Sequence, residues 1–149
     1  MQIKSLLVAI TLPLTLVLTA CSGGSNPDVS ARQDVMKDWK DAMSVMGGMA
    51  KAPETFDLAK FQENAKFLAE SANKPWAHFA DKNQLGEATD AVWVNATEFK
   101  AETENFQKVT AELNTTAQNA TTLEEILPAL KPVGDSCQSC HEDFRKAKD

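Results

Sequence analysis

The chain has 149 residues, with 21 Asp and Glu against 15 Lys and Arg, so its formal net charge is −6. Nucleic-acid binding needs clustered cations, which this acidic chain lacks, so no nucleic-acid partner is expected. The sequence also contains no phosphate-binding loop, nucleophile motif or acid/base pair. These absences argue against an enzyme and leave binding, electron-transfer and structural roles.

The first 20 residues are predicted to be an export signal. Lys4 is followed by an uncharged apolar run to Ala20, and Pro13 interrupts that run. The run approaches the length of a membrane span, but the proline and the small residues at its end are typical of a cleaved signal.

The signal ends in "LTAC", residues 18–21, which resembles the lipobox of bacterial lipoproteins, whose cysteine is acylated and becomes the mature N-terminus. By analogy with that class, Ser22 favours the outer membrane. The protein would then lie in the periplasmic space and contact the membrane only through the lipid on Cys21. An ordinary secretory signal that leaves Cys21 as a free thiol is the alternative.

Cleavage before Cys21 leaves 129 residues, enough for one domain, with 14 cations against 21 anions and a charge of −7. Residues 21–27 are predicted to form a flexible tether, and residues 28–149 the domain. Export places the domain in an oxidising compartment, where its two remaining cysteines would pair unless something else used them.

Apolar residues recur every three or four positions along the domain, which predicts helices over residues 29–51, over 58–72 and from Thr89 to about 119. Asp28 or Ser30 is expected to cap the first helix. Residues 73–88 have no sustained period and form the long connection.

Pro128 and Pro132 fall in the last segment, where an interior proline breaks or kinks a helix. A short turn over 123–127 and a main helix from about Val133 to Lys146 are therefore expected. No segment alternates as a β-strand does. Four helices with apolar seams predict an all-α, up-and-down antiparallel four-helix bundle.

The last predicted helix contains "CQSCH" at residues 137–141. On a helix, Cys137, Cys140 and His141 stand at i, i+3 and i+4, so all three project from one face and one flat ligand can meet them. The pattern C-x-x-C-H is the attachment signal for haem c. The two thiols add to the vinyl groups of the porphyrin, and His141 supplies an axial nitrogen to the iron.

Three other roles for the two cysteines fit the sequence less well, because each requires a feature that the sequence does not supply. A thioredoxin-type redox pair follows a strand, and no strand is predicted. A structural zinc site needs a fourth ligand, for which His78 or an acidic side chain are the candidates. A disulfide between Cys137 and Cys140 closes too small a loop to stabilise much.

The C-terminal "CQSCHEDFRK" resembles the cytochrome c′ family, the class II c-type cytochromes. "ARQDVMK" is similar to the Arg-x-x-x-Leu/Met pattern of that family's first helix, and "PWAHF", the Trp93 to Phe99 spacing and Gly134 also fit. The lipobox, Phe144 in place of a common tyrosine, and the two prolines depart from the family pattern.

This resemblance implies a four-helix bundle with one covalently attached haem c per chain, often dimeric, and roles for four residues. It makes His141 the proximal iron ligand and places Arg145 beside the proximal pocket, Arg32 at a haem propionate and Met36 above the iron on the distal face. The alternatives are a helix-terminal cation for Arg145, a solvated helix residue for Arg32 and a core methionine for Met36.

The role of Met36 decides between two functions. A vacant, apolar sixth position admits diatomic gases such as NO and CO, as in cytochromes c′, whereas a Met36 sulfur bonded to iron makes a low-spin electron carrier that needs a redox partner protein. His78 is a further possible sixth ligand. A cofactor-free or zinc-bound structural lipoprotein is the alternative from a different class.

Overall fold

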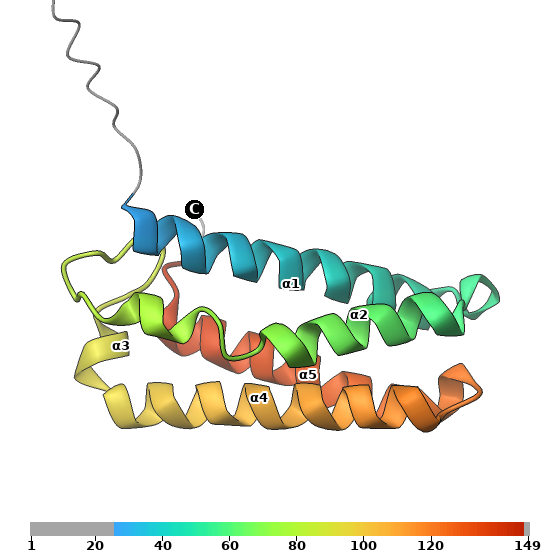
Figure 1. The fold of residues 1–149 in the computed structure, drawn as a ribbon. Helices are drawn as coiled ribbons and strands as arrows, with labels where there is room; N and C mark the ends of the chain where they lie inside the picture. Colours follow the sequence, from blue (N-terminus) through green and yellow to red (C-terminus); the bar gives the residue numbers. More distant parts are fainter. Residues whose placement is uncertain (1–25, 148–149) are drawn as a thin grey trace, which may run out of the picture.

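A computed structural model describes residues 26–147, which form four long helices (Figure 1). These helices are α1 (Pro27–Lys51), α2 (Leu58–Ser71), α4 (Ala96–Asn119) and α5 (Leu123–Phe144). Three single turns lie between them: η1 (Pro53–Thr55), η2 (Trp76–Phe79) and α3 (Ala91–Val94). The predicted export signal, Cys21 and the tether up to residue 25 lie outside the described residues.

The four helices run alternately up and down, so the end of α5 returns to the beginning of α1 (Figure 1). This confirms the predicted all-α, four-helix bundle. Between residues 26 and 147 no helix is long and apolar enough to cross a membrane. The long connection between α2 and α4 lies at the end of the bundle where α1 starts and α5 stops.

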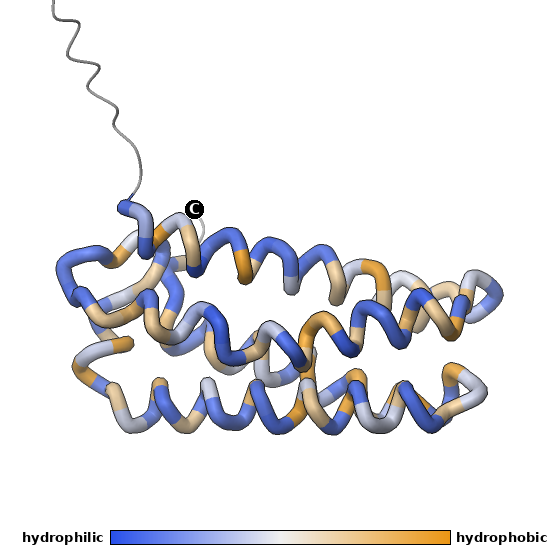
Figure 2. Tube along the Cα trace, in the orientation of Figure 1, coloured by the Kyte–Doolittle hydropathy of each residue, from blue (hydrophilic) through white to orange (hydrophobic). Residues whose placement is uncertain are grey.

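Apolar side chains from all four helices meet along the bundle axis, and the tube in Figure 2 shows how they alternate with polar residues along each helix. Met46 of α1, Leu68 of α2, Leu113 of α4 and Ile126 of α5 are each fully buried. The three-to-four periodicity thus identified the inward faces. Ala96 is an exception: its spacing predicts an inward position on the third predicted helix, but it is exposed.

The prolines do not divide α5, which runs unbroken from Leu123 to Phe144 with Pro128 and Pro132 inside it. The prediction of a turn over 123–127 and a separate main helix was therefore wrong. Both prolines are one turn apart on the solvent side of the helix. The carbonyl groups of Glu124 and Pro128, which lose their helical partners, belong to exposed residues and can bond water instead.

Two other helix boundaries differ from the predictions. The cap of α1 is Asn26, whose side chain accepts from the backbone N–H of Asp28 at 2.8 Å, and not Asp28 or Ser30. Asn-Pro at 26–27 is the start signal, because proline favours the first helical position. The third predicted helix is interrupted at Asn95, which separates α3 from α4.

Candidate functional site

Two adjacent cavities of about 350 and 250 Å³ lie between α1 and α5, near the end of the bundle that holds the long connection. Met36, Lys40, Cys140 and His141 line both cavities, so the two form one continuous slot. Together they fall in the range of about 300–1,000 Å³ that holds cofactors and drug-sized ligands.

The α5 wall of this slot carries the predicted attachment motif. Cys137 and Cys140 are half-buried, are not joined to each other, and face the slot together with His141. Burial raises the pKa of both thiols. For Cys140 the pKa reaches about 11, with the negative charge of Glu102 as the second cause after burial. The structure thus brings the three motif residues to one cavity wall.

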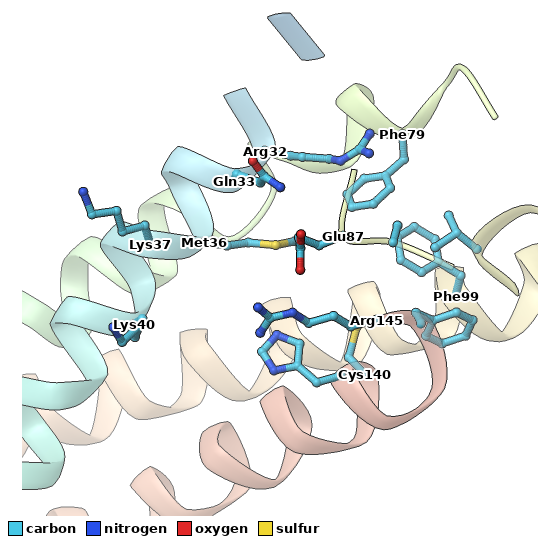
Figure 3. Close-up of a pocket in the computed structure, with 14 residues that line it drawn as sticks. Arg32, Gln33, Met36, Lys37, Lys40, Phe79, Glu87, Phe99, Cys140 and Arg145 are labelled. Atoms are coloured by element: carbon cyan, nitrogen blue, oxygen red, sulfur yellow. The ribbon is translucent and has the colours of Figure 1, made fainter. Parts of the chain in front are cut away.

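Met36 lies on the opposite wall, on α1, with its thioether directed away from that helix into the slot (Figure 3). It is half-buried and lines both cavities. Phe79 and Phe99 close the slot at the end near the long connection (Figure 3). The spacing of α1 therefore places Met36 across the slot from the motif.

Arg32 is not a solvated helix residue, since it is only 3% exposed. Its Nη1 donates to the carbonyl oxygen of His78 at 2.6 Å, and its Nη2 donates to those of Gln84 and, at 2.7 Å, Leu85. The guanidinium also lies 4.4 Å from the ring centroid of Phe79. Burial lowers the pKa of Arg32, and Asp28 partly opposes that effect. Three of its five N–H donors thus hold the long connection against α1.

Arg145 and His78 are the other predicted site residues. Arg145 is the first residue after α5 and has an extended backbone, yet it lines the larger cavity beside Cys140 (Figure 3). His78 lines neither cavity: its Nδ1 is 2.8 Å from Oδ1 of Asp28, at the start of α1. The structure therefore gathers Arg32, Met36, Arg145 and the motif around one slot and leaves the His78 imidazole outside it.

The slot is also lined by residues that were not predicted as site residues, among them Phe79, Glu87, Phe99 and Glu102. The signal for Glu102 was available, because it lies three residues after Phe99 and four before Phe106. An acidic residue on the apolar stripe of a helix has to meet something polar or charged. The two phenylalanines carried no comparable signal, since aromatic residues are ordinary core residues.

The residues around the slot suit a haem group. Two unjoined thiols and an imidazole line one wall, a methionine lines the other, and aromatic rings close the end. Two buried side-chain oxygens on the same slot, Glu102 Oε2 and Ser136 Oγ, have no hydrogen-bond partner among residues 26–147. Within the described chain, no group of three His, Cys, Asp and Glu side chains is placed to hold a metal ion, as the zinc alternative requires.

Fold and slot together define a four-helix protein built to bind a c-type haem. The family model "Cytochrome C'" matches residues 28–145, and the chain belongs to the cytochrome c′ family. It is 28% identical over 123 residues to the cytochrome c′ of Alcaligenes xylosoxydans xylosoxydans, an alignment that covers 78% of this chain and 96% of that one.

Two solved structures of cytochrome c prime variants from Alcaligenes xylosoxidans have the same fold. The first, a ferrous variant with bound NO, has a TM-score of 0.75 at 28% identity and covers 81% of this chain and 94% of its own. The second, with bound carbon monoxide, has a TM-score of 0.76 at 26% identity and covers 84% and 98%.

Family membership establishes the cofactor: the chain carries one covalently attached haem c. Cytochromes c′ are haem proteins, not typical enzymes, and are generally periplasmic. The covalently attached haem excludes the alternative of a cofactor-free or zinc-bound structural lipoprotein.

Proposed function

We propose that this protein binds diatomic gases, NO and CO, at a five-coordinate haem iron in the slot between α1 and α5. The observation that carries the proposal is the position of Met36, which lines both parts of the slot on the wall opposite His141. Apolar side chains, among them Phe79, Val92 and Phe99, surround this region. Such a lining disfavours water at the sixth position and leaves room for a small uncharged ligand.

The known structures support this proposal, because the fold neighbours described above hold NO in one case and carbon monoxide in the other. When bound, the haem supplies an iron atom that takes up a gas molecule or exchanges one electron. In the proposal, Cys137 and Cys140 hold the porphyrin through thioethers, His141 is the proximal ligand, and Arg145 covers the proximal side.

Electron transfer is the second candidate, favoured by the same residue. The thioether of Met36 points into the slot, and a methionine on the side opposite an axial histidine is a known ligand set of c-type cytochromes. If its sulfur bonds iron, the sixth position is filled, gases compete poorly, and the protein shuttles electrons to a partner.

The optical spectrum of the haem-loaded protein separates the two functions. We expect a high-spin spectrum in the ferric and ferrous states, conversion on addition of NO or CO, and little change in Met36→Ala. Met36→Leu is the matched control, because it keeps the volume and removes the sulfur. A low-spin spectrum that turns high-spin in both variants would instead make Met36 the ligand and electron transfer the function.

The attachment residues have a test of their own. Replacing both Cys137 and Cys140 by serine should yield a protein whose denatured mass lacks the haem, whereas each single variant should keep one thioether bond. Gln138→Ser, between the two cysteines, is the control and should keep the full haem mass. Haem retained through denaturation in the double variant would show that other residues hold it.

We also propose that the domain, residues 28–149, is tethered by residues 21–27 to a lipid on Cys21 at the outer membrane. The proposal rests on the "LTAC" pattern at residues 18–21. Labelled palmitate should enter the wild-type protein and not Cys21→Ser, which should be released in soluble form from fractionated cells. Equal membrane association of the two proteins would contradict a lipid anchor.

A further inference from the structure

The side chain of Glu102 lies on α4, in the wall of the smaller cavity that it shares with Cys137, Cys140 and His141. Its Oε1 accepts a hydrogen bond from Oγ of Ser139 at 3.0 Å, and Ser139 stands inside the attachment motif. One oxygen of Glu102 is therefore fixed to the segment that carries the haem.

The other oxygen, Oε2, is fully buried and has no hydrogen-bond partner in the part of the chain that the structure describes. A buried carboxylate with one unpaired oxygen is costly in an apolar surrounding unless a positive charge or a donor faces it. Among the side chains of the smaller cavity, Lys40 of α1 is the one lysine or arginine, and it is exposed. The lining of this cavity therefore gives Glu102 no buried lysine or arginine as a partner.

Glu102 and the two attachment cysteines, Cys137 and Cys140, line the same cavity. The unpaired oxygen, the bond to Ser139 and the shared cavity together place a fixed negative charge beside the group bound at these cysteines.

We propose that Glu102 is a positioning residue that sets the reduction potential of the haem, its carboxylate stabilising the ferric over the ferrous state. Ferric iron in the porphyrin ring carries one more positive charge than ferrous iron. A nearby carboxylate therefore favours the oxidised form, and in a water-poor cavity the attraction is only weakly screened. The one-electron reduction of the iron is the only step involved, and its electron comes from the external reductant or electrode.

The inference rests on the haem being attached at Cys137 and Cys140, as in the proposed function, and it holds for a gas-binding and for an electron-transferring iron. Glu102→Gln keeps the shape and removes the charge. We expect the ferric-to-ferrous ratio at a fixed applied potential to fall about tenfold, which is an upward shift of about 59 mV for one electron.

Spectroelectrochemical titration of the haem-loaded proteins measures this shift. Glu98→Gln is the matched control, since Glu98 lies one turn earlier on α4 and is exposed, and its potential should stay at the wild-type value. Ser139→Ala keeps the charge and removes the hydrogen bond, so it should stay closer to wild type than Glu102→Gln does. If instead the loss of the bond matters, the two variants will shift alike.

An unchanged potential in Glu102→Gln, with normal haem content and absorbance, would overturn the role of Glu102 and leave the proposed function intact. A shift of equal size in Glu98→Gln or Ser139→Ala would overturn it as well. Wild-type protein without covalently attached haem would be a failure of the proposed function itself.

Discussion

Arg32 on α1 donates from Nη1 to the main-chain carbonyl oxygen of His78, 46 residues further along the chain, at a distance of 2.6 Å. With the bonds to Gln84 and Leu85, this contact fixes the long connection against the start of α1. The same connection supplies Phe79 and Ala88 to the wall of the slot. Arg32 therefore shapes one end of the haem site through backbone contacts.

Replacing Arg32 by methionine should destabilise the fold. The side chain keeps most of its apolar length but leaves three carbonyl groups without their donor, and hydrogen bonds from a charged group are worth about 1.5–3 kcal/mol each. Because water can reach part of the exposed connection, we expect a loss of about 3 kcal/mol in total. Urea unfolding of the haem-loaded protein measures it. Lys37→Met, five residues on and exposed, should change the stability by less than about 0.5 kcal/mol.

Arg32→Lys gives a second check of this contact. Lysine keeps the charge but not the planar fork, so it cannot reach three carbonyl groups at once. We expect a stability between wild type and Arg32→Met. If Arg32→Lys matches wild type, charge and not the multiple hydrogen bonds holds the connection.

Gly86 has a φ of +53°, and a Cβ at this position would lie 2.6 Å from Cγ1 of Val29. Gly86→Ala should therefore cost about 1–3 kcal/mol, since it adds a clash to an unfavourable backbone conformation. Gly48→Ala is the opposite case: it lies inside α1, and a Cβ there meets nothing within 4 Å. That change should stabilise the protein by about 0.5–1 kcal/mol. Equal effects of the two variants in thermal unfolding would contradict this assignment.

Trp39 of α1 and Ser71 of α2 form a buried polar contact between the two helices. The indole Nε1 donates to Oγ of Ser71 at 2.8 Å, and that hydroxyl donates to the carbonyl oxygen of Phe67 at 2.6 Å. Ser71→Ala leaves the indole N–H buried without an acceptor, at a cost of about 1–3 kcal/mol. In a Trp39→Phe background the donor is gone, so the same change should cost clearly less. Additive losses in this double-mutant cycle would mean that the contact contributes nothing of its own.

Most of the fold could be predicted from the sequence because apolar residues recur every three or four positions along each long helix. The spacing of residues 58–72 predicts one seam made of Leu58, Phe61, Ala65, Leu68 and Ala72. The last four are buried and Leu58 is half-buried. The predicted break at Pro128 was wrong for a physical reason. The cost of a proline inside a helix depends on whether the carbonyl group that loses its partner can reach water, and that exposure depends on how α5 packs.

In the candidate site, too, the residues on helices could be predicted from the sequence, whereas the contacts made by the long connection could not. Cys137, Cys140, His141 and Met36 come together because each lies on a helix whose face the sequence reveals. The contacts of Arg32 with three carbonyl groups depend on the path of the connection, which has no periodic pattern. The position of Glu102 on an apolar stripe can be predicted from the spacing along its helix. Its hydrogen-bond partner, Ser139, cannot, because it lies 37 residues away on another helix.

Burial raises the pKa of Cys140 to about 11, and this has a consequence for the chain before haem is attached. In the unfolded chain a cysteine ionises near pH 8.5, so above that pH the unfolded state loses its proton first. The contribution of the neutral thiol to stability is complete below about pH 8.5 and is lost as the pH rises toward 11. Between these limits we expect the haem-free chain to lose about 3 kcal/mol through this residue, since each pKa unit is worth about 1.4 kcal/mol.

Urea unfolding of the haem-free domain at pH 8 and pH 10.5, followed by circular dichroism, measures this loss. Cys140→Ala is the control, because it removes this thiol and keeps the rest of the chain, and its stability should fall less over the same interval. In the haem-loaded protein, a thioether at Cys140 has no proton to lose, so the cysteine-specific difference should vanish. The same pH dependence in the haem-free wild type and Cys140→Ala would show that this thiol is not held in its neutral form by burial.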